Sequence, residues 1–416
     1  MATTTINTTA PLSTTVSEAL KEHYKPQRIK NMVYENNPLL GLMPKYEKFG
    51  GENMPIPIIV TGPQRRSANF ETAQTNTSTS TVKQFQLTRV KDYSFAAIEH
   101  EALKASMNNV DAFVRYATME IDGAIHALKR SMAVAMYRDG TGAIGQQSAT
   151  ASDPGGGTTL TLTSAADSSN FEVGMNIVLA ASTTGALLSN VGTKTITGID
   201  RDAGTLTVST LHADADAGDY FFQEGDAHAG ASYKKMRGLE AWVPSSAPSS
   251  ATFFNVDRTA DVTRLGGVRF DGSALPIEEA LIGGASQVAR EGGTPTHCFM
   301  DFDSYANLEK ALGSKIVYDR VKSAYADVGF DTMTVQGPKG RIQIIPDHNC
   351  QPNVAWMLQL DTWSLNTLGS APQILDADGA GTLLRVHSLD AYECRVGMYG
   401  NIACNAPGYN CRIALA

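Results

Sequence analysis

The chain has 416 residues, of which 42% are hydrophobic and 18% are charged, and its formal net charge is −8. This length is enough for a packed core and for two or three domains. The negative charge excludes a protein that binds nucleic acid over its whole surface, so any contact with DNA would use local patches. Because no apolar run approaches the roughly 20 residues of a membrane helix and the N-terminus lacks a signal peptide, we expect a cytosolic product without membrane contact.

Residues 1–46 are predicted to form an N-terminal arm. Its first part is rich in threonine, and a short amphipathic helix is expected over residues 15–23. Further along, Leu39, Leu40 and Met43 lie between prolines and form a small apolar anchor. We expect this anchor to dock on another surface, and we predict these three side chains to be contacts between subunits.

Residues 47–98 are predicted to form an extended two-stranded loop. Residues 53–60 and 82–95 have the alternating pattern of strands, and a polar tip of about 20 residues joins them. Since an isolated two-stranded ribbon is marginal in water, we expect this one to be stabilised by another subunit. Arg65 and Arg66 are expected to dock on acidic groups of the neighbour, and Phe70 is a further predicted subunit contact.

The next segment predicts a long helix followed by a glycine loop. Apolar residues recur at helical spacing over residues 109–138, which gives a strut roughly 45 Å long with one apolar face. Residues 140–145 then read GTGAIG, a match to the dinucleotide fingerprint G-x-G-x-x-G. That fingerprint needs a strand before it and a helix after it. Because a helix precedes it here, we expect Gly140 to cap the helix, and Gly142 and Gly145 to turn the chain.

Short strands with Gly, Asp and Ser turns follow over residues 150–230 and predict an inserted β barrel or sandwich. Residues 212–219 and 347–350 are better explained as turns than as metal sites. Residues 272–375 have a mixed α/β pattern, and residues 376–416 predict closing strands. The fold class is therefore α+β.

Cysteine usage and the absence of catalytic motifs argue against an enzyme or a metalloprotein. The cysteines are odd in number and form no C-x-x-C pair, which predicts buried, reduced thiols. We find no P-loop and no hydrolase or zinc-protease motif, so no catalytic, cofactor-binding or metal-binding residue is predicted. The five cysteines are Cys298, Cys350, Cys394, Cys404 and Cys411.

The order of these parts resembles the major capsid protein of tailed phages, with the Hong Kong ninety-seven type capsid fold. The supporting segments are NPLLGLMPK before GGENMPIPI, IEHEALKAS before the long helix, MYRDGTGAIG at its end, RGLEAWVP after the insertion, and PTHCFMDFDSYANLEKAL. The resemblance runs from about residue 30 to the end. It implies a peripheral domain in residues 99–149 and 231–271, and an axial domain in residues 272–375, with residues 376–416 completing both sheets. The inserted β domain is a departure from the family pattern.

The resemblance also implies a function. The chain would assemble with itself into pentamers and hexamers of an icosahedral head that encloses double-stranded DNA by weak, non-specific contact. Its partners would be a portal and a separate scaffold or decoration protein, and it would reside in the virion capsid after assembly in the host bacterial cytoplasm. Two alternatives stay open: an encapsulin-like protein compartment, and a nucleotide-cofactor enzyme that uses residues 140–145.

Overall fold

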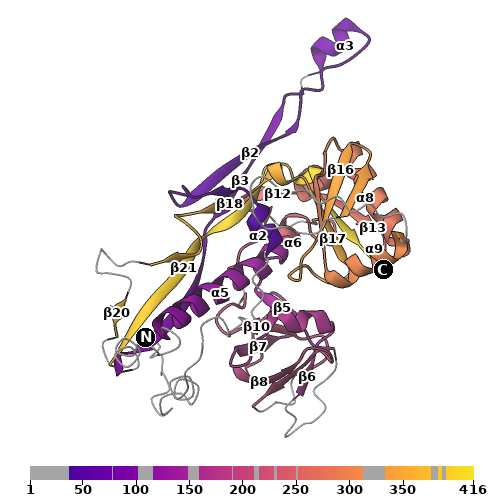
Figure 1. Cartoon of the computed structure of the whole chain (residues 1–416). Coiled ribbons are helices and arrows are strands. Elements are labelled where there is room, and N and C mark those ends of the chain that lie inside the picture. The colour runs from indigo at the N-terminus through magenta and orange to yellow at the C-terminus, as the bar shows by residue number, and fades with distance from the viewer. Residues whose placement is uncertain are drawn as a thin grey trace. The chain divides into compact units, whose positions relative to one another are not determined.

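The computed structural model describes residues 37–76, 78–101, 116–148, 159–189, 191–209, 215–228, 232–249, 252–312, 333–375, 383–386 and 390–416. The chain divides into a smaller unit, which includes residues 92–130 and 370–398, and a larger unit, which includes residues 36–91, 131–369 and 399–416. Helices and strands are mixed along the chain (Figure 1), so the predicted α+β class is confirmed. The predicted helix over residues 15–23 and most of the arm lie outside the described residues. No described helix is both long enough and apolar enough to cross a membrane.

A two-stranded hairpin with a short helix at its tip lies near the start of the larger unit (Figure 1). β2 (Asn53–Thr61) pairs antiparallel with β3 (Thr81–Thr88), and α3 (Phe70–Thr75) lies between them. The predicted strand over residues 53–60 is confirmed. The predicted partner over residues 82–95 is two strands instead of one, because β3 ends at Thr88 and β4 (Val90–Glu99) pairs with a different strand, β21 (Ala391–Cys404).

The long helix is α5 (Tyr116–Tyr137), which confirms the prediction over those residues; residues 109–115 lie outside the described part. Its last turn is approached by the backbone of Gly238, whose N–H donates to the Arg138 carbonyl at 2.9 Å. A Cβ at this glycine would lie 2.1 Å from the Met136 oxygen, so only glycine fits. Gly140 lies beyond the C′ position of α5, and its φ of +88° serves the turn that follows instead of the predicted helix cap.

The insertion is a closed six-stranded antiparallel barrel. Its two end strands, β5 and β6, are joined by hydrogen bonds from the Ser148 N–H to the Thr161 oxygen (2.9 Å) and from the Thr163 N–H to the Gln146 oxygen (2.8 Å). Closure leaves no open sheet edge. The barrel starts at Ala143, seven residues before the predicted boundary at 150. In sheet order, the strands are β5 (Ala143–Gln146), β10 (Tyr220–Gln223), β7 (Asn176–Ala180), β8 (Lys194–Asp200), β9 (Thr205–Val208) and β6 (Thr159–Thr161).

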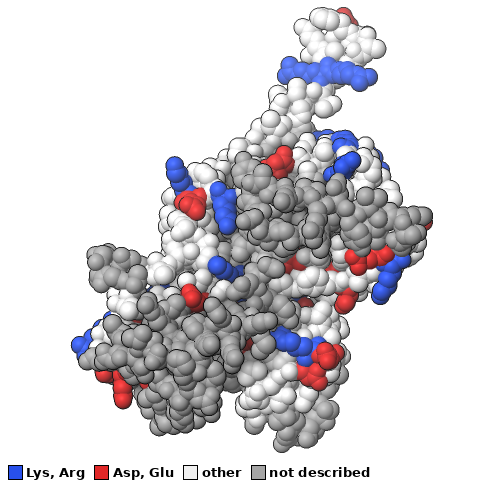
Figure 2. Space-filling view, in the orientation of Figure 1, with Lys and Arg blue, Asp and Glu red and all other residues white. Residues whose placement is uncertain are grey.

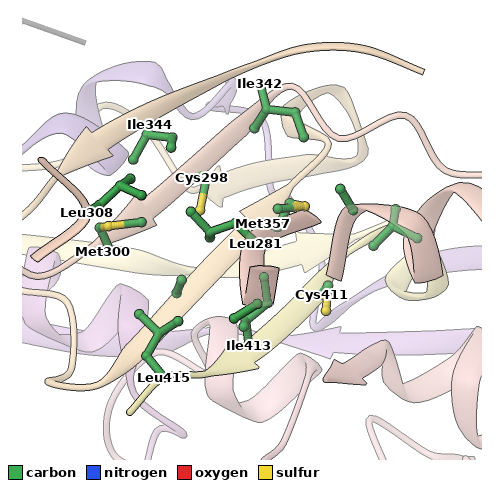
Figure 3. Close-up of a cluster of buried hydrophobic side chains, with 14 of the residues drawn as sticks. Leu281, Cys298, Met300, Leu308, Ile342, Ile344, Met357, Cys411, Ile413 and Leu415 are labelled. Carbon is green, nitrogen blue, oxygen red and sulfur yellow. The ribbon is translucent and has the colours of Figure 1, made fainter. Parts of the chain in front are cut away.

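A mixed six-stranded sheet carries one of the hydrophobic cores, and it is called the axial sheet here because four of its strands lie in residues 272–375, the predicted axial domain. Leu281 of one helix, Met300 and Ile344 of the central strands and Ile413 of the last strand pack together in it (Figure 3). The strand that carries Ile413 comes from the C-terminal end of the chain and lies inside the sheet. In sheet order, the strands are β13 (Val268–Asp271), β22 (Cys411–Ala414), β17 (Val354–Leu358), β14 (His297–Met300), β16 (Gly340–Pro346) and β15 (Met333–Gly337). The helices beside it are α8 (Ile277–Arg290) and α9 (Phe302–Leu312).

A further sheet is built around β21. In the larger unit, β18 (Trp363–Thr367) pairs with residues 400–404 of β21 and with β1 (Lys45–Tyr46). In the smaller unit, residues 392–397 of β21 pair with β19 (Gln373–Ile374) and β20 (Leu384–Arg385). The remaining short elements are α2 (Pro38–Leu42), α6 (Leu239–Trp242), β11 (Thr252–Phe253), β12 (Val256–Asp257) and α7 (Val262–Gly266).

All five cysteines are buried free thiols, as predicted. Burial raises the pKa of Cys298 to about 12, so this thiol stays protonated at neutral pH. A thiol in this state is a core side chain rather than a nucleophile.

Candidate functional site

The tip of the hairpin is a short helix that leaves an aromatic side chain uncovered. Asn69 starts α3, because its Oδ1 accepts hydrogen bonds from the N–H groups of Glu71 (2.9 Å) and Thr72 (3.5 Å). No residue of α3 is buried. Phe70 is 81% exposed, the largest exposure among the large hydrophobic side chains of the described residues. An exposed aromatic group of this kind marks a contact surface.

Basic side chains form a band across the ribbon close to α3 (Figure 2). The sequence places Arg65 and Arg66 there, and both are exposed. Arg65 Nε donates to the Ser78 carbonyl at 3.3 Å, a contact that joins the two legs of the tip. The structure thus brings Arg65, Arg66 and Phe70 onto one small, exposed segment.

The predicted apolar anchor is buried within the single chain. Leu39, Leu40 and Met43 are 1%, 9% and 2% exposed within the single chain. The anchor therefore packs on its own chain. The contact of these three residues with another subunit stays a prediction.

The base of the hairpin is held by an aromatic cluster. The Phe85 ring lies 5.1 Å from the Trp242 ring and 6.1 Å from the Phe253 ring, between centroids. Such edge-to-face pairs stabilise beyond the burial of their area. On β2, the Val60 carbonyl accepts a hydrogen bond from Arg264 Nη1 at 2.6 Å. The inner face of the hairpin is therefore held at Phe85 and again at Val60, near the tip-side end of the paired strands, while its other face is exposed.

Two arginines that the sequence analysis did not single out complete this cluster. The Arg237 guanidinium lies 3.5 Å from the Tyr233 ring centroid, and that of Arg258 lies 4.2 Å from the Phe253 centroid. Burial, followed by the nearby charges of Arg237 and Arg269, lowers the pKa of Arg258 to about 10. The aromatic residues beside each arginine, YKKMR and TFFNVDR, are the sequence signal for such stacking.

An open cavity of about 570 Å³ lies beside this cluster. It is lined by Asn53 and Thr88 of the hairpin, by Arg89 and Arg237, and by Phe254. This lining combines cationic and aromatic groups, so the cavity suits an acidic or aromatic side chain.

The glycine loop does not form a nucleotide site. Gly142 has a φ of +90°, and a Cβ there would lie 2.4 Å from the Asp226 carbonyl oxygen. Gly145 is not the predicted turn, because it lies inside β5, where a Cβ would meet the Phe171 ring at 3.2 Å. The chain continues from the loop as a strand, so the helix N-terminus that a pyrophosphate needs does not follow. The GTGAIG segment is the entry to the barrel.

The other candidate motifs are turns where they are described. At residues 347–350, Asp347 accepts hydrogen bonds from Tyr137 Oη at 2.8 Å and from the Asn349 N–H at 2.9 Å, which confirms the predicted turn. Of residues 212–219, the first three lie outside the described part, and Asp219 accepts from the Asp216 N–H at 2.8 Å. Within the described ranges, no three His, Cys, Asp or Glu side chains are grouped to hold a metal ion.

Comparisons with known proteins agree with this architecture. Residues 218–381 match the family model described as the SU10 major capsid protein. The fold is similar to that in the capsid asymmetric unit of cyanophage A-1(L), with 11% identity, a TM-score of 0.56, and coverage of 97% of this chain and 98% of that one. Mycobacterium phage Ogopogo gives 13% identity, a TM-score of 0.46, and coverage of 97% and 99%. The SrpI encapsulin complex from Synechococcus elongatus gives 7% identity and a TM-score of 0.44, with coverage of 93% of this chain and 91% of that one. No curated protein sequence matches the chain significantly.

The fold is of the Hong Kong ninety-seven type found in that phage capsid, as the sequence analysis predicted. Residues 218–381 are in addition similar to the SU10 major capsid protein family. The resemblance to a tailed-phage major capsid protein that the sequence analysis stated is therefore supported over residues 218–381.

Proposed function

We propose that this protein is a phage major capsid protein that assembles with itself, as pentamers and hexamers, into an icosahedral head that encloses double-stranded DNA. The observation that supports this most strongly is the hairpin, whose tip and outer face are exposed in the single chain. A two-stranded ribbon alone is marginal in water, so a neighbouring copy is the natural source of its missing contacts. The chain has a structural and non-enzymatic role in this proposal.

The parts of the chain take different roles in the shell. The axial sheet lies at the centre of each capsomer, and α5 with the strands around β21 forms the peripheral domain. The hairpin overlaps an adjacent subunit, where Arg65, Arg66 and Phe70 make contacts. Many such contacts, each modest, add up in a closed assembly of identical subunits.

The net charge of −8 supports a weak and non-specific contact with the enclosed genome. A portal, and a separate scaffold or decoration protein, complete the head, and the inserted barrel is the surface that we assign to decoration. The head is assembled in the cytoplasm of the host bacterium, and the protein then resides in the virion.

Electron microscopy of the purified protein and of particles from infected or expressing cells tests this proposal. We expect closed icosahedral particles with both pentameric and hexameric capsomers, and nuclease-resistant DNA inside those from infected cells. Only small soluble species under all assembly conditions would contradict it. Closed particles that contain protein cargo and no DNA would support the encapsulin-like alternative instead.

A further inference from the structure

The two strands of the hairpin have different backbone edges. In an antiparallel pair, residues alternate between those whose N–H and C=O groups face the partner strand and those whose groups point away from it. Proline has no N–H and takes the outward positions. Pro55 and Pro57 lie opposite Gln86 and Gln84. These two glutamines therefore direct their backbone groups to the outer edge of β3.

A contact at the base of the hairpin confirms this alternation. The Gln86 N–H donates to the Phe254 carbonyl, outside the hairpin, at 2.9 Å. The next outward positions along β3 are Gln84 and Val82. Among the described residues, neither of their N–H groups is hydrogen-bonded outside the hairpin. The outer edge of β3 is thus hydrogen-bonded at its base, and above it the amides of Gln84 and Val82 form no such bond within the described ranges, although β12 (Val256–Asp257) contacts β3.

The opposite edge of the hairpin cannot be extended in the same way. On β2, two successive outward positions are Pro55 and Pro57, which lack the donor that an added strand requires. Natural sheets use proline to block edges against unwanted pairing. The sequence therefore blocks one edge of this ribbon and leaves the other edge able to pair.

We propose that the outer edge of β3, at residues 82–84, receives an extended strand from a second copy of this chain. The added strand turns the ribbon into a three-stranded sheet, the size at which a sheet becomes independently stable. This inference rests on the proposed function, because it names the backbone contact by which the hairpin joins a neighbour.

The exposed side chains beside this edge favour the same occupant. Ile59 and Val82 lie opposite each other and are 71% and 57% exposed. A strand added next to Val82 brings side chains that cover this apolar pair. The edge also belongs to the same ribbon as Phe70, the predicted subunit contact at the tip, so one neighbouring copy can cover both.

Hydrogen exchange measures the proposed hydrogen bonds directly. We expect the Gln84 amide to exchange at least about 100-fold more slowly in assembled particles than in unassembled protein. The Gln86 amide, already bonded to Phe254, is the internal control and stays protected in both states. Equal exchange of the Gln84 amide in both states would overturn the inference. Protection that is already complete in the unassembled protein would overturn it as well, because the same chain would then cover the edge.

A matched pair of variants tests the effect on assembly. Gln84→Pro removes the outward N–H, while Gln84→Thr keeps it and changes only the side chain. The ribbon already carries proline at the opposite position, Pro57, so it accommodates the ring. Tryptophan fluorescence, to which Trp242 contributes with its ring 5.1 Å from that of Phe85, reports whether the hairpin base is intact.

With normal fluorescence in both variants, we expect Gln84→Pro to yield below about a tenth of the particles of Gln84→Thr, because the added strand loses a ladder hydrogen bond and meets the ring. Wild-type yield from Gln84→Pro would overturn this inference alone. Failure of the unaltered chain to form any particle would instead overturn the proposed function.

Discussion

The axial sheet and the hairpin are both built from strands, but they differ in where their stabilisation comes from. In β17 of the axial sheet, all five residues are buried. In β3 of the hairpin, only Phe85 and Leu87 are buried, and both lie near the base. The axial sheet is therefore completed by its own chain, whereas the hairpin has an outer face and an edge that its own chain leaves uncovered. A capsid subunit needs both, a region that folds alone and a region that needs a neighbour.

The largest expected loss of stability is at the base of the hairpin, where a side chain is as fully buried as in the axial core. Phe85 is 0% exposed and packs on Trp242 and Phe253. We expect Phe85→Ala to lower the free energy of unfolding by about 3–5 kcal/mol, because it removes a buried ring and leaves a cavity. Urea denaturation followed by tryptophan fluorescence measures this. Ile59→Ala, on the exposed face of the same hairpin, should change stability by less than about 0.5 kcal/mol.

A second pair of variants makes the same contrast on α8, the helix beside the axial sheet. Leu281 is 2% exposed in the axial core, and its neighbour Ile282 is 50% exposed. We expect Leu281→Ala to cost about 2–5 kcal/mol and Ile282→Ala to cost less than about 0.5 kcal/mol in the unassembled protein. Similar losses for both variants would mean that α8 does not pack on the sheet by the face described here.

The tip should behave in the opposite way, with a small effect on the subunit and a clear effect on the shell. Phe70 is 81% exposed, so Phe70→Ala should leave the melting temperature of the unassembled protein unchanged. Loss of a buried interface aromatic costs about 2 kcal/mol, which predicts a roughly 30-fold weaker subunit contact. The protein concentration needed for assembly, measured by light scattering, should therefore rise. The matched variant Glu71→Gln changes the same helix but keeps the Phe70 ring, so it should assemble at the normal concentration if the ring makes the contact.

The buried thiols should make the stability of the folded protein depend on pH. Burial raises the pKa of Cys298 to about 12 and that of Cys411 further, while unfolded thiols ionise near 8.5. The folded state then holds more protons than the unfolded state above this pH. Stability is constant below about pH 8.5 and falls as the pH rises, by up to about 1.4 kcal/mol per pH unit for each thiol. Thermal melts from pH 7 to 10 measure the slope, and Cys298→Ala should reduce it by one thiol's share.

Local patterns predicted the elements well, because periodicity is a property of neighbouring residues. The strand over residues 53–60, the helix over 116–137 and the strands near the C-terminus are examples. The break at Arg89 was not visible, since the alternating pattern continues from β3 into β4 although the two strands pair with different partners. The start of the barrel was missed because β5 is short, contains glycine and pairs with β10, which lies about 75 residues later.

The candidate site was predictable only in part. A polar tip with Arg65 and Arg66 is a local feature, and the sequence displays it directly. Whether an apolar group is covered by its own chain depends on residues far away in the sequence, so the burial of Leu39, Leu40 and Met43 could not be predicted. The stacking of Arg237 and Arg258 on aromatic rings likewise depends on the tertiary fold.

Deletion of residues 66–79 tests the central claim, that the hairpin is completed by a neighbour in a shell, most directly. The deletion leaves a five-residue loop between Thr61 and Thr81, which already pair, so the base of the hairpin is kept. Analytical ultracentrifugation and electron microscopy then compare this variant with the full chain. We predict a folded, soluble subunit with unchanged tryptophan fluorescence and no closed particles. Closed particles in normal yield and of normal size would contradict the account.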